Sequence, residues 1–374
     1  MKISELSISQ FRNIKQLNLK PSEQINLFYG DNAQGKTNIL EAIYYLSTGR
    51  SFRAKQDGDC IPYDYENKSV EVRNTNISAK ICRQEGDIKI HIHLNKDEKI
   101  VTINQKKINK LSLLWGKFPT VLFIPDDIQI IKGNPQKRRR FLDTSIGQIH
   151  SQYLIYLQRY DFIIRERNAL LKSIKDIKAI KEQINIWDKQ LIEIGTEILF
   201  QRNAMTKKIA EYFAQSYNAI SSSKENAELI YTPSFDKEFF AHKKSAYEIY
   251  KITLEENLKS DLKIGYTQIG PHRDDFDILL DGKSAKYFSS QGQQKSSILA
   301  LKMAEIYYMN QEKGEMPVLL IDDLSSELDD KRLLNFLELL GEGIQTFITS
   351  IALIQSIKSN FSTSSFKIKN GEIT

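Results

Sequence analysis

One octapeptide near the start of the chain, Gly30-Asp31-Asn32-Ala33-Gln34-Gly35-Lys36-Thr37, limits the fold more than any other feature. It follows an apolar run, residues 25–29, that reads as a strand, and it precedes residues 38–46, whose apolar side chains recur at helical spacing. The two glycines permit a tight turn whose N–H groups point inward at phosphate oxygens, and the helix start adds its dipole. The pattern is that of a Walker A loop, and we predict that residues from Gly30 to Asn38 bind a nucleotide.

A second motif, Val318-Leu319-Leu320-Ile321-Asp322-Asp323, is an apolar run closed by two carboxylates. A buried strand has this appearance, and it would deliver its acids to a metal ion at its carboxyl end. We assign Thr37 and Asp322 to Mg²⁺, Asp323 to orienting the attacking water, and Lys36 to the β- and γ-phosphates. The sequence therefore predicts an enzyme that hydrolyses ATP with Mg²⁺.

The composition is that of an ordinary globular protein. The chain has 374 residues, enough for two to three domain-sized units, and 41% of them are hydrophobic. Its longest apolar runs are far too short to span a membrane, and the N-terminus lacks the apolar stretch of a signal peptide. The cysteines, Cys60 and Cys82, have neither metal nor redox spacing. We expect a cytoplasmic protein with no membrane partner.

Positive charge is unevenly spread. The formal net charge is +6, and a cluster of five cations comprises Lys132, Lys137, Arg138, Arg139 and Arg140. Such a cluster serves either a polyanion such as DNA or a solvated face of the protein, and charge alone does not decide between them.

The order of elements predicts two strands at residues 2–8 and 14–19, then an antiparallel meander over residues 69–103. From about residue 145 to 215, helical periodicity predicts a hairpin of about 35 residues per arm, roughly 50 Å long, with its turn near residues 178–181. Its apolar seam would be either intramolecular core or the binding face for a partner helix.

A third motif, Ser290-Gln291-Gly292-Gln293, opens a helix and resembles the signature loop of ABC-type ATPases. That resemblance implies that Ser290, Gly292 and Gln293 cap a γ-phosphate held by the Walker A loop of a second copy, and hence an ATP-dependent homodimer. Residues 325–329 then stand where the family has its D-loop, with Asp329 as a further nucleotide contact.

The helical insert between these motifs resembles the ABC ATPases related to SMC proteins, and within them the RecF family of bacterial recombination and repair proteins. The blocks that carry this resemblance are residues 6–13, 35–43, 125–143, 270–275 and 326–329. It implies an α/β fold class: an ABC-type P-loop ATPase head, with a mixed sheet and an antiparallel subsheet, and an inserted helical second lobe or short coiled-coil hairpin. We predict residues 1–144 and 263–374 as the two parts of the head and residues 145–262 as the helical lobe.

The same resemblance implies a DNA-dependent ATPase of low turnover in DNA replication, recombination and the SOS response. It would bind gapped or junction DNA, including single strands, help to load RecA, and have RecO and RecR as partners. Arg12 and Asn13 would lie near the nucleotide or merely form a surface turn. Arg138, Arg139 and Arg140 would contact DNA or form a salt-bridge cluster inside the second lobe.

Three departures from the related ATPases stand out. Ala33 replaces a usual glycine, so we expect no positive φ there. Asp323 is one methylene shorter than the usual glutamate, which fits slow turnover, and residues 346–350 end without the switch histidine of transporters. Two rival functions remain, a transporter's nucleotide-binding subunit and a scaffold that binds ATP without hydrolysing it.

Overall fold

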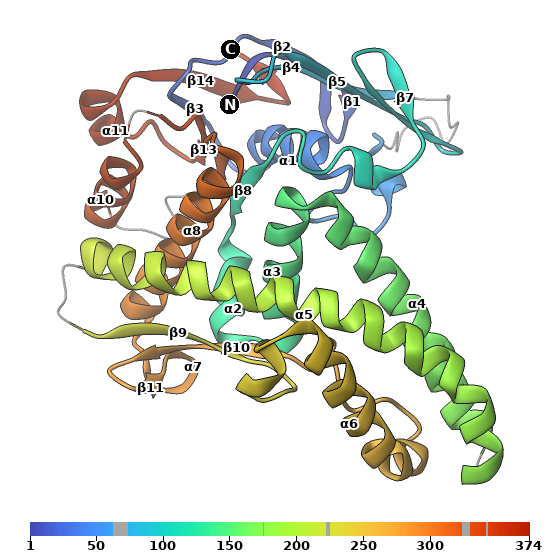
Figure 1. The fold of residues 1–374 in the computed structure, drawn as a ribbon. Helices are drawn as coiled ribbons and strands as arrows, with labels where there is room; N and C mark the ends of the chain where they lie inside the picture. The colour runs from blue at the N-terminus through green and yellow to red at the C-terminus, as the bar shows by residue number, and fades with distance from the viewer. Residues whose placement is uncertain (63–73, 175, 222–224, 324–329, 342) are drawn as a thin grey trace. The chain divides into compact units, whose positions relative to one another are not determined.

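We analysed a computed structural model of the chain, which describes residues 1–62, 74–174, 176–221, 225–323, 330–341 and 343–374 (Figure 1). The side chains of residues 330–333, 356 and 358 lie outside this description. The chain divides into two compact units. The first comprises residues 1–128, 215–224 and 290–374, and the second comprises residues 129–214 and 225–289.

An antiparallel sheet forms the outer layer of the first unit. Its strand order is β2-β1-β4-β5-β6-β7, with β1 (Lys2–Phe11), β2 (Ile14–Leu19), β4 (Thr75–Cys82), β5 (Ile88–Leu94), β6 (Lys99–Ile103) and β7 (Lys106–Ile108). Burial alternates along β4 and β5, as expected for a sheet with one face in the core and one in water. The predicted strands are confirmed, and so is the meander from β4 onward, while its residues 69–73 lie outside the described residues.

A mainly parallel sheet carries the motifs. Its order is β15-β14-β3-β13-β12-β8, with β3 (Ile25–Tyr29), β8 (Thr120–Phe123), β12 (Val318–Ile321), β13 (Thr346–Ser350), β14 (Thr363–Lys369) and β15 (Glu372–Ile373). All residues of β12 and β13 are buried, because a parallel sheet is covered on both faces. Strand β3, which leads into the Walker A loop, lies between β13 and β14, two strands that come much later in the sequence.

Helix α1 (Lys36–Thr48) joins the two sheets into one hydrophobic core. Its apolar side chains pack with residues of β1, β4 and β5 and with Leu320 and Phe347 of the parallel sheet. The remaining helices of this unit are α8 (Gln291–Lys313), α10 (Asp330–Leu340) and α11 (Gln355–Asn360). Because α1 is packed on most of its surface, the loop before it stands on a rigid support.

The second unit combines long helices with a small antiparallel sheet of order β11-β10-β9. Its helices are α2 (Ile128–Lys132, whose first residue belongs to the first unit), α3 (Pro135–Ile149), α4 (Ser151–Ser173), α5 (Ile177–Ser221, counted with this unit up to residue 214), α6 (Lys243–Ile264) and α7 (Ala285–Phe288). Its strands are β9 (Ala227–Thr232), β10 (Asp275–Leu280) and β11 (Lys283–Ser284).

The predicted hairpin exists, but the prediction that its two arms have equal length is wrong. Helix α4 has 23 residues and ends at Ser173, and α5 has 45 and begins at Ile177, so the predicted turn at residues 178–181 lies within α5. A third helix, α6, also packs on the far part of the hairpin, where its Leu258 and Leu262 join Leu171, Ile180 and Ile184 in one cluster. This part of the apolar seam is therefore intramolecular core.

The predicted boundaries after residues 144 and 262 differ from the division into compact units, which changes after residues 128 and 289. One of the contacts that link the reassigned segments is the ion pair of Arg138 on α3 with Asp275 on β10, through two hydrogen bonds of 2.6 and 2.8 Å. Segments that had been placed in the head on sequence grounds thus fold together with the helices.

Candidate nucleotide site

The Walker A loop depends on backbone conformations that glycine adopts easily. Gly30 has φ 146° and Gly35 has φ 103°. A Cβ on Gly30 would lie 2.4 Å from the carbonyl oxygen of Ile368, and one on Gly35 would lie 2.5 Å from the Asn13 amide oxygen. Ala33 has φ 63°, so the expectation of negative φ there was wrong. An alanine in this left-handed region is strained, and the surrounding loop holds it there.

The turn between β14 and β15 braces the middle of the loop. Gly371 N–H donates to the Gln34 carbonyl at 2.8 Å, and Asn370 N–H donates to the Gln34 side-chain oxygen at 2.7 Å. Residues 336 positions apart in the chain are thereby joined. Asp31, Asn32 and Ala33 remain exposed on the outer side of the loop.

Lys36 lies inside the loop at the start of α1. Its ammonium donates to the carbonyl oxygens of Gly30 and Asp31, both at 2.6 Å. Burial lowers the pKa of Lys36, and the carboxylates of Asp323, Asp31 and Asp322 oppose that shift. A partly desolvated ammonium surrounded by turning backbone is the arrangement that binds a phosphate oxygen strongly.

The two predicted metal ligands meet at the end of β12. Thr37 Oγ1 donates to Asp322 Oδ1 at 2.8 Å, although these residues are 285 positions apart. Thr349 Oγ1 donates to the same oxygen at 2.7 Å. It also accepts from the N–H of Asp323 at 2.8 Å. One threonine of β13 thus fixes both acids.

The environment of Asp322 suits a cation. Its side chain is 7% exposed, and burial raises its pKa while the hydrogen bonds from Thr349 and Thr37 oppose that shift. A buried carboxylate and a hydroxyl are the hard oxygen ligands that Mg²⁺ prefers, so these residues fit the ion. Asp323 follows with φ 49°, a left-handed conformation that turns the chain sharply after the strand.

A buried carboxylate that the sequence did not single out organises the other side of α1. Glu41 is fully buried, and it accepts hydrogen bonds from Arg12 at 2.7 and 3.1 Å and from Arg53 and Ser51. Burial would raise the pKa of Glu41, but these hydrogen bonds outweigh it and lower that pKa. Arg12 is therefore held against α1 and is not a free surface residue.

Asn13 and Asn38 connect this cluster to the loop. Asn38 Nδ2 donates to Asn13 Oδ1 at 2.7 Å, and Asn38 Oδ1 accepts from Arg53. A hollow of about 450 Å³ lies beside them, lined by Arg12, Asn38, Arg53, Ala54, Lys55 and Asp59. Arg53 comes from a coil segment without any motif, so no sequence pattern pointed to it.

The predicted signature loop begins α8. Ser290 is the N-cap: its hydroxyl accepts from Gln293 N–H at 3.3 Å, and its own N–H donates to the Gln293 side chain at 2.7 Å. Ser290 and Gln291 are exposed, with Gly292 and Gln293 half-buried behind them. This exposed start of a 23-residue helix presents N–H groups and a positive dipole to whatever approaches. Asp329, the predicted D-loop contact, lies outside the described residues.

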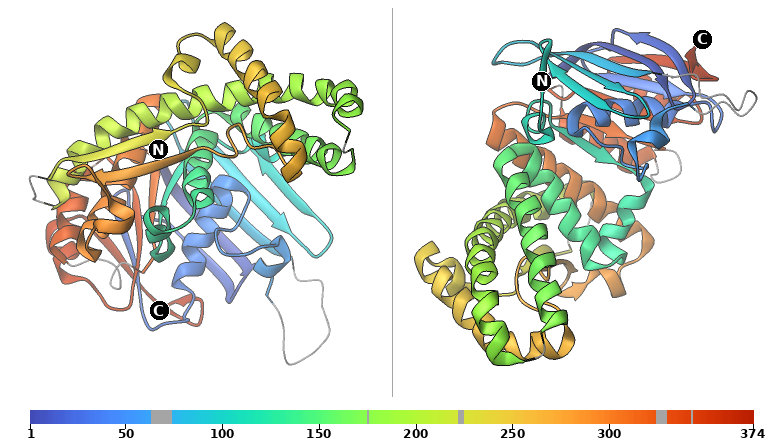
Figure 2. Two further views of the ribbon diagram at one scale, coloured as in Figure 1. Left: turned by 90° about the horizontal axis from the view of Figure 1, so that it is seen from below. Right: turned by 90° about the vertical axis from the view of Figure 1, so that its right-hand side faces the viewer.

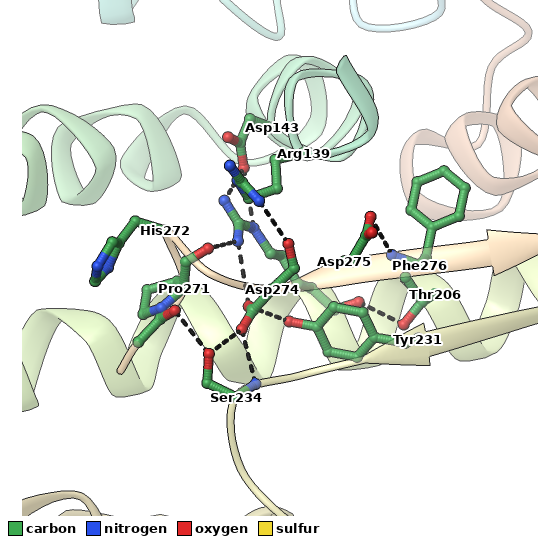
Figure 3. A network of polar contacts seen from close by, with 12 residues as sticks. Arg139, Asp143, Thr206, Tyr231, Ser234, Pro271, His272, Asp274, Asp275 and Phe276 are labelled. Atoms are coloured by element: carbon green, nitrogen blue, oxygen red, sulfur yellow. Dashed lines mark hydrogen bonds and ion pairs between the residues drawn. The ribbon is translucent and has the colours of Figure 1, made fainter. Parts of the chain in front are cut away.

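Two members of the basic cluster, Arg138 and Arg139, bind acidic partners or backbone within the second unit, as Figure 3 shows for Arg139, whereas Lys132 and Lys137 are exposed. Arg138 is 6% exposed and bound to Asp275, so it is a poor DNA ligand and the salt-bridge interpretation applies to it. Arg139 is half-buried and donates to the Asp274 carbonyl oxygen at 2.7 Å. Arg140 alone of the three is exposed.

Two of the blocks that carry the resemblance, residues 125–143 and 270–275, are joined by Arg202 of α5. The guanidinium of Arg202 contacts Asp143 at 2.8 Å and Asp274 at 3.2 Å, and it donates to the Pro271 carbonyl oxygen at 2.5 Å. Tyr231 also donates to Asp274 at 2.5 Å (Figure 3). Residues 138–143 and 270–275 thus form one buried polar network.

With this geometry established, comparison with known proteins is decisive. The family model for the RecF/RecN/SMC N terminal domain matches residues 2–373. The chain is 37% identical over 385 residues to the DNA replication and repair protein RecF of Natranaerobius thermophilus, covering 100% of this chain and 97% of that protein. It is 38% identical over 374 residues to the DNA replication and repair protein RecF of Streptococcus equi subsp. zooepidemicus, covering 100% of this chain and 98% of that protein. The chain belongs to the RecF family.

Solved structures agree with this assignment. The RecF-family chain is similar to the recombination mediator protein RecF-ATPrS in the RecFOR pathway, with 35% identity, a TM-score of 0.89 and coverage of 100% of this chain and 97% of that one. The corresponding RecF-ATP structure is 36% identical, has a TM-score of 0.88, and is matched over 100% of this chain and 96% of that one. An Smc head bound to the C-winged helix domain of ScpA is 14% identical, with a TM-score of 0.56 and coverage of 100% of this chain and 96% of that one. This likeness concerns the fold alone.

Several predictions are thereby confirmed. The fold is the ABC-type ATPase head of RecF and SMC proteins, and the family is one of DNA replication and repair proteins that bind ATP. Within the described residues, no helix has the length and apolar character needed for crossing a membrane. The residues that the sequence missed, Thr349, Glu41 and Arg53, act through other site residues and so leave no motif.

Proposed function

We propose that this RecF-family protein binds ATP, pairs two copies around it on gapped or junction DNA, and reopens after slow hydrolysis, thereby helping to load RecA. The observation that carries the proposal is the hydrogen bond from Thr37 to Asp322, which unites the two ends of the chain beside the Walker A loop. A coincidental glycine turn would not face a buried carboxylate.

The roles follow from what each group can donate. Lys36 and the N–H groups of the loop would hold the β- and γ-phosphates, with Asn13 and Asn38 at the side of the nucleotide. Thr37 and Asp322 would hold Mg²⁺, which when bound neutralises phosphate charge. Asp323 would orient the attacking water, and its backbone is fixed for this role by Thr349. Positioning and charge neutralisation are what phosphoryl transfer chiefly requires.

Pairing of two copies is supported by the exposed start of α8. Ser290 and the helix N-terminus form an anion site open to solvent, as a γ-phosphate from a second copy would need. Immediately before it in the sequence, Tyr287 and Phe288 are 72% and 71% exposed. Exposed neighbouring aromatic side chains are typical of interaction surfaces.

The relatives supply the biological setting. RecF-ATP and RecF-ATPrS are described as a recombination mediator in the RecFOR pathway, so we place RecO and RecR among the partners of this chain. DNA would be held mainly through its phosphates, with exposed Arg140 as the remaining candidate among the three predicted arginines. Each phosphate neutralised should then lower log affinity by about 0.9 per log unit of salt.

Analytical ultracentrifugation with and without ATP and a gapped duplex tests the proposal. The parent protein should sediment as a dimer with ATP, and Ser290→Arg should bind ATP while remaining monomeric, because the arginine side chain obstructs the cap. Ser151→Arg, at the exposed start of α4, is the matched control and should pair normally. Equal sedimentation of Ser290→Arg and the parent with ATP would contradict the dimer, and DNA affinity independent of salt would contradict the phosphate-based interface.

A further inference from the structure

Strand β9 leaves one edge without a strand partner in the part of the chain that the structure describes, because it ends the sheet of order β11-β10-β9. The hydrogen bond from Asp281 N–H to the Asn226 carbonyl at 2.8 Å shows which residues of β9 form hydrogen-bonded pairs with β10, because Asn226 and Asp281 are themselves such a pair. Hydrogen-bonded pairs alternate along an antiparallel ladder, so Glu228 and Ile230 also bond toward β10. The N–H and C=O groups of Leu229 and Tyr231 therefore point to the free edge.

A groove of about 770 Å³ follows this edge. It is lined by Leu229, Ile230, Tyr231 and Thr232 of β9, by Asn203, Thr206, Lys207 and Ala210 of α5, and by Pro233, Phe235, Asp236, Lys237 and Phe240. Residues on one face of a strand alternate, so four consecutive lining residues show that the groove runs along the edge itself. Figure 1 and the left view of Figure 2 both place β9 beside α5.

The groove has an apolar floor and a mainly positive rim. Leu229 and Phe235 are each 7% exposed and line its base with Phe240, whereas Lys207 and Lys237 are exposed at its margin with a single carboxylate, Asp236. Natural edge strands are commonly blocked by an internal lysine, a proline or a covering element. The sequence of β9, Ala-Glu-Leu-Ile-Tyr-Thr, contains neither residue.

We propose that this groove binds an extended segment of another protein, which adds a strand to β9 and carries acidic side chains toward Lys207 and Lys237. Four residues of β9 offer about 13 Å of edge at 3.3–3.4 Å per residue, enough for a short strand. The free groups of β9 alternate between donors and acceptors, and a peptide backbone satisfies both. A nucleic-acid backbone offers phosphate acceptors and would leave the free carbonyl oxygens of β9 unmatched.

The probe is an array of fluorescein-labelled heptapeptides with glutamate at both ends and valine at positions two, four and six. Full-length protein should bind members of this array, measured by fluorescence anisotropy. N-methylation of the backbone amides on one edge of the peptide should weaken binding at least about tenfold, which is about 1.4 kcal/mol. Absence of binding by every member up to about 1 mM, or equal binding of the methylated peptides, would overturn the proposal.

Charge reversal locates the site. The double variant Lys207→Glu with Lys237→Glu should lose at least about tenfold in affinity for the acidic peptides, because both ammonium groups face the bound strand. Lys189→Glu, at an exposed position of α5 outside the groove, should bind like the parent. Equal losses in the two proteins would show that only net charge matters and would refute the assigned site.

Amide hydrogen exchange gives a readout that a simple apolar pocket would not produce. Bound peptide should slow exchange of the amides of Leu229 and Tyr231, which face the free edge, far more than that of Ile230, which bonds to β10. Uniform slowing would contradict strand addition. Protection of the same two amides by raising the protein concentration alone would identify a second copy as the occupant and sink the proposal.

Discussion

Thr349→Val provides the sharpest test of how the two acids are held. The substitution replaces a hydroxyl by a methyl group of similar size at a position 1% exposed, so packing is nearly preserved. It removes the 2.7 Å hydrogen bond to Asp322 and leaves the N–H of Asp323 without its 2.8 Å acceptor. The variant therefore isolates the polar role of one atom.

The magnitude follows from these two contacts. A hydrogen bond to a charged group contributes about 1.5–3 kcal/mol, and an unsatisfied buried N–H costs about 1–3 kcal/mol. If the first amount is lost from the transition state for hydrolysis, the rate falls about 10- to 150-fold. The second amount appears as a lower unfolding temperature, by about 2–4 °C per kcal/mol for a unit of this size.

Steady-state phosphate release across a Mg²⁺ titration measures the effect, with differential scanning fluorimetry for stability. We expect Thr349→Val to hydrolyse ATP more slowly and to require more Mg²⁺. Thr346→Val is the control, because it lies on the same strand, is also 1% exposed, and makes no side-chain hydrogen bond to either acid. A variant at position 349 with parental rate and Mg²⁺ dependence would refute the positioning role.

Three further outcomes are expected. Asp323→Asn should prolong the ATP-bound dimer, seen as slower dissociation after a chase with unlabelled ATP; an unchanged phosphate release rate would favour a scaffold that does not hydrolyse ATP. Arg138→Met should cost about 3–5 kcal/mol in urea unfolding because it leaves Asp275 unpaired, whereas Arg140→Met should change stability by less than about 0.5 kcal/mol and instead weaken DNA binding. Burial lowers the pKa of His272 to about 4, so the unfolded chain takes up the proton first as pH falls below about 6.5. The free energy of unfolding should therefore drop by up to about 3 kcal/mol between about pH 6.5 and pH 4. In urea unfolding at a series of pH values, His272→Gln should flatten that slope.

The motifs to which we assign nucleotide and Mg²⁺ binding could be located from the sequence. Glycines at fixed spacing and paired acids after an apolar strand serve one chemistry, so Lys36, Thr37 and Asp322 were recognisable, and Thr37 and Asp322 do lie together. The alternation of β4 and β5 likewise indicated the antiparallel sheet. These patterns are local, and a local pattern can be recognised in a single sequence.

The failures share a different cause, since each depends on a partner far away in the chain. Ala33 takes a left-handed conformation because the Asn370–Gly371 turn fixes the neighbouring Gln34. Arg138 is buried because Asp275 is its partner, which a run of basic residues cannot reveal. The packing of α6 on α4 and α5 was not predicted, because contacts between separate helices appear only in three dimensions.

The placement of β3 between β13 and β14 has a consequence for synthesis on the ribosome. Strand β3 leads into the phosphate loop, yet its two neighbours, β13 and β14, are synthesised roughly 320–340 residues later. At about 5–20 residues per second, the nascent chain waits roughly 15–70 s with two unpaired edges on an apolar strand. The phosphate loop thus gains its full support only after these two later strands have been made, and chaperones that shield such edges should matter most for the yield at high temperature.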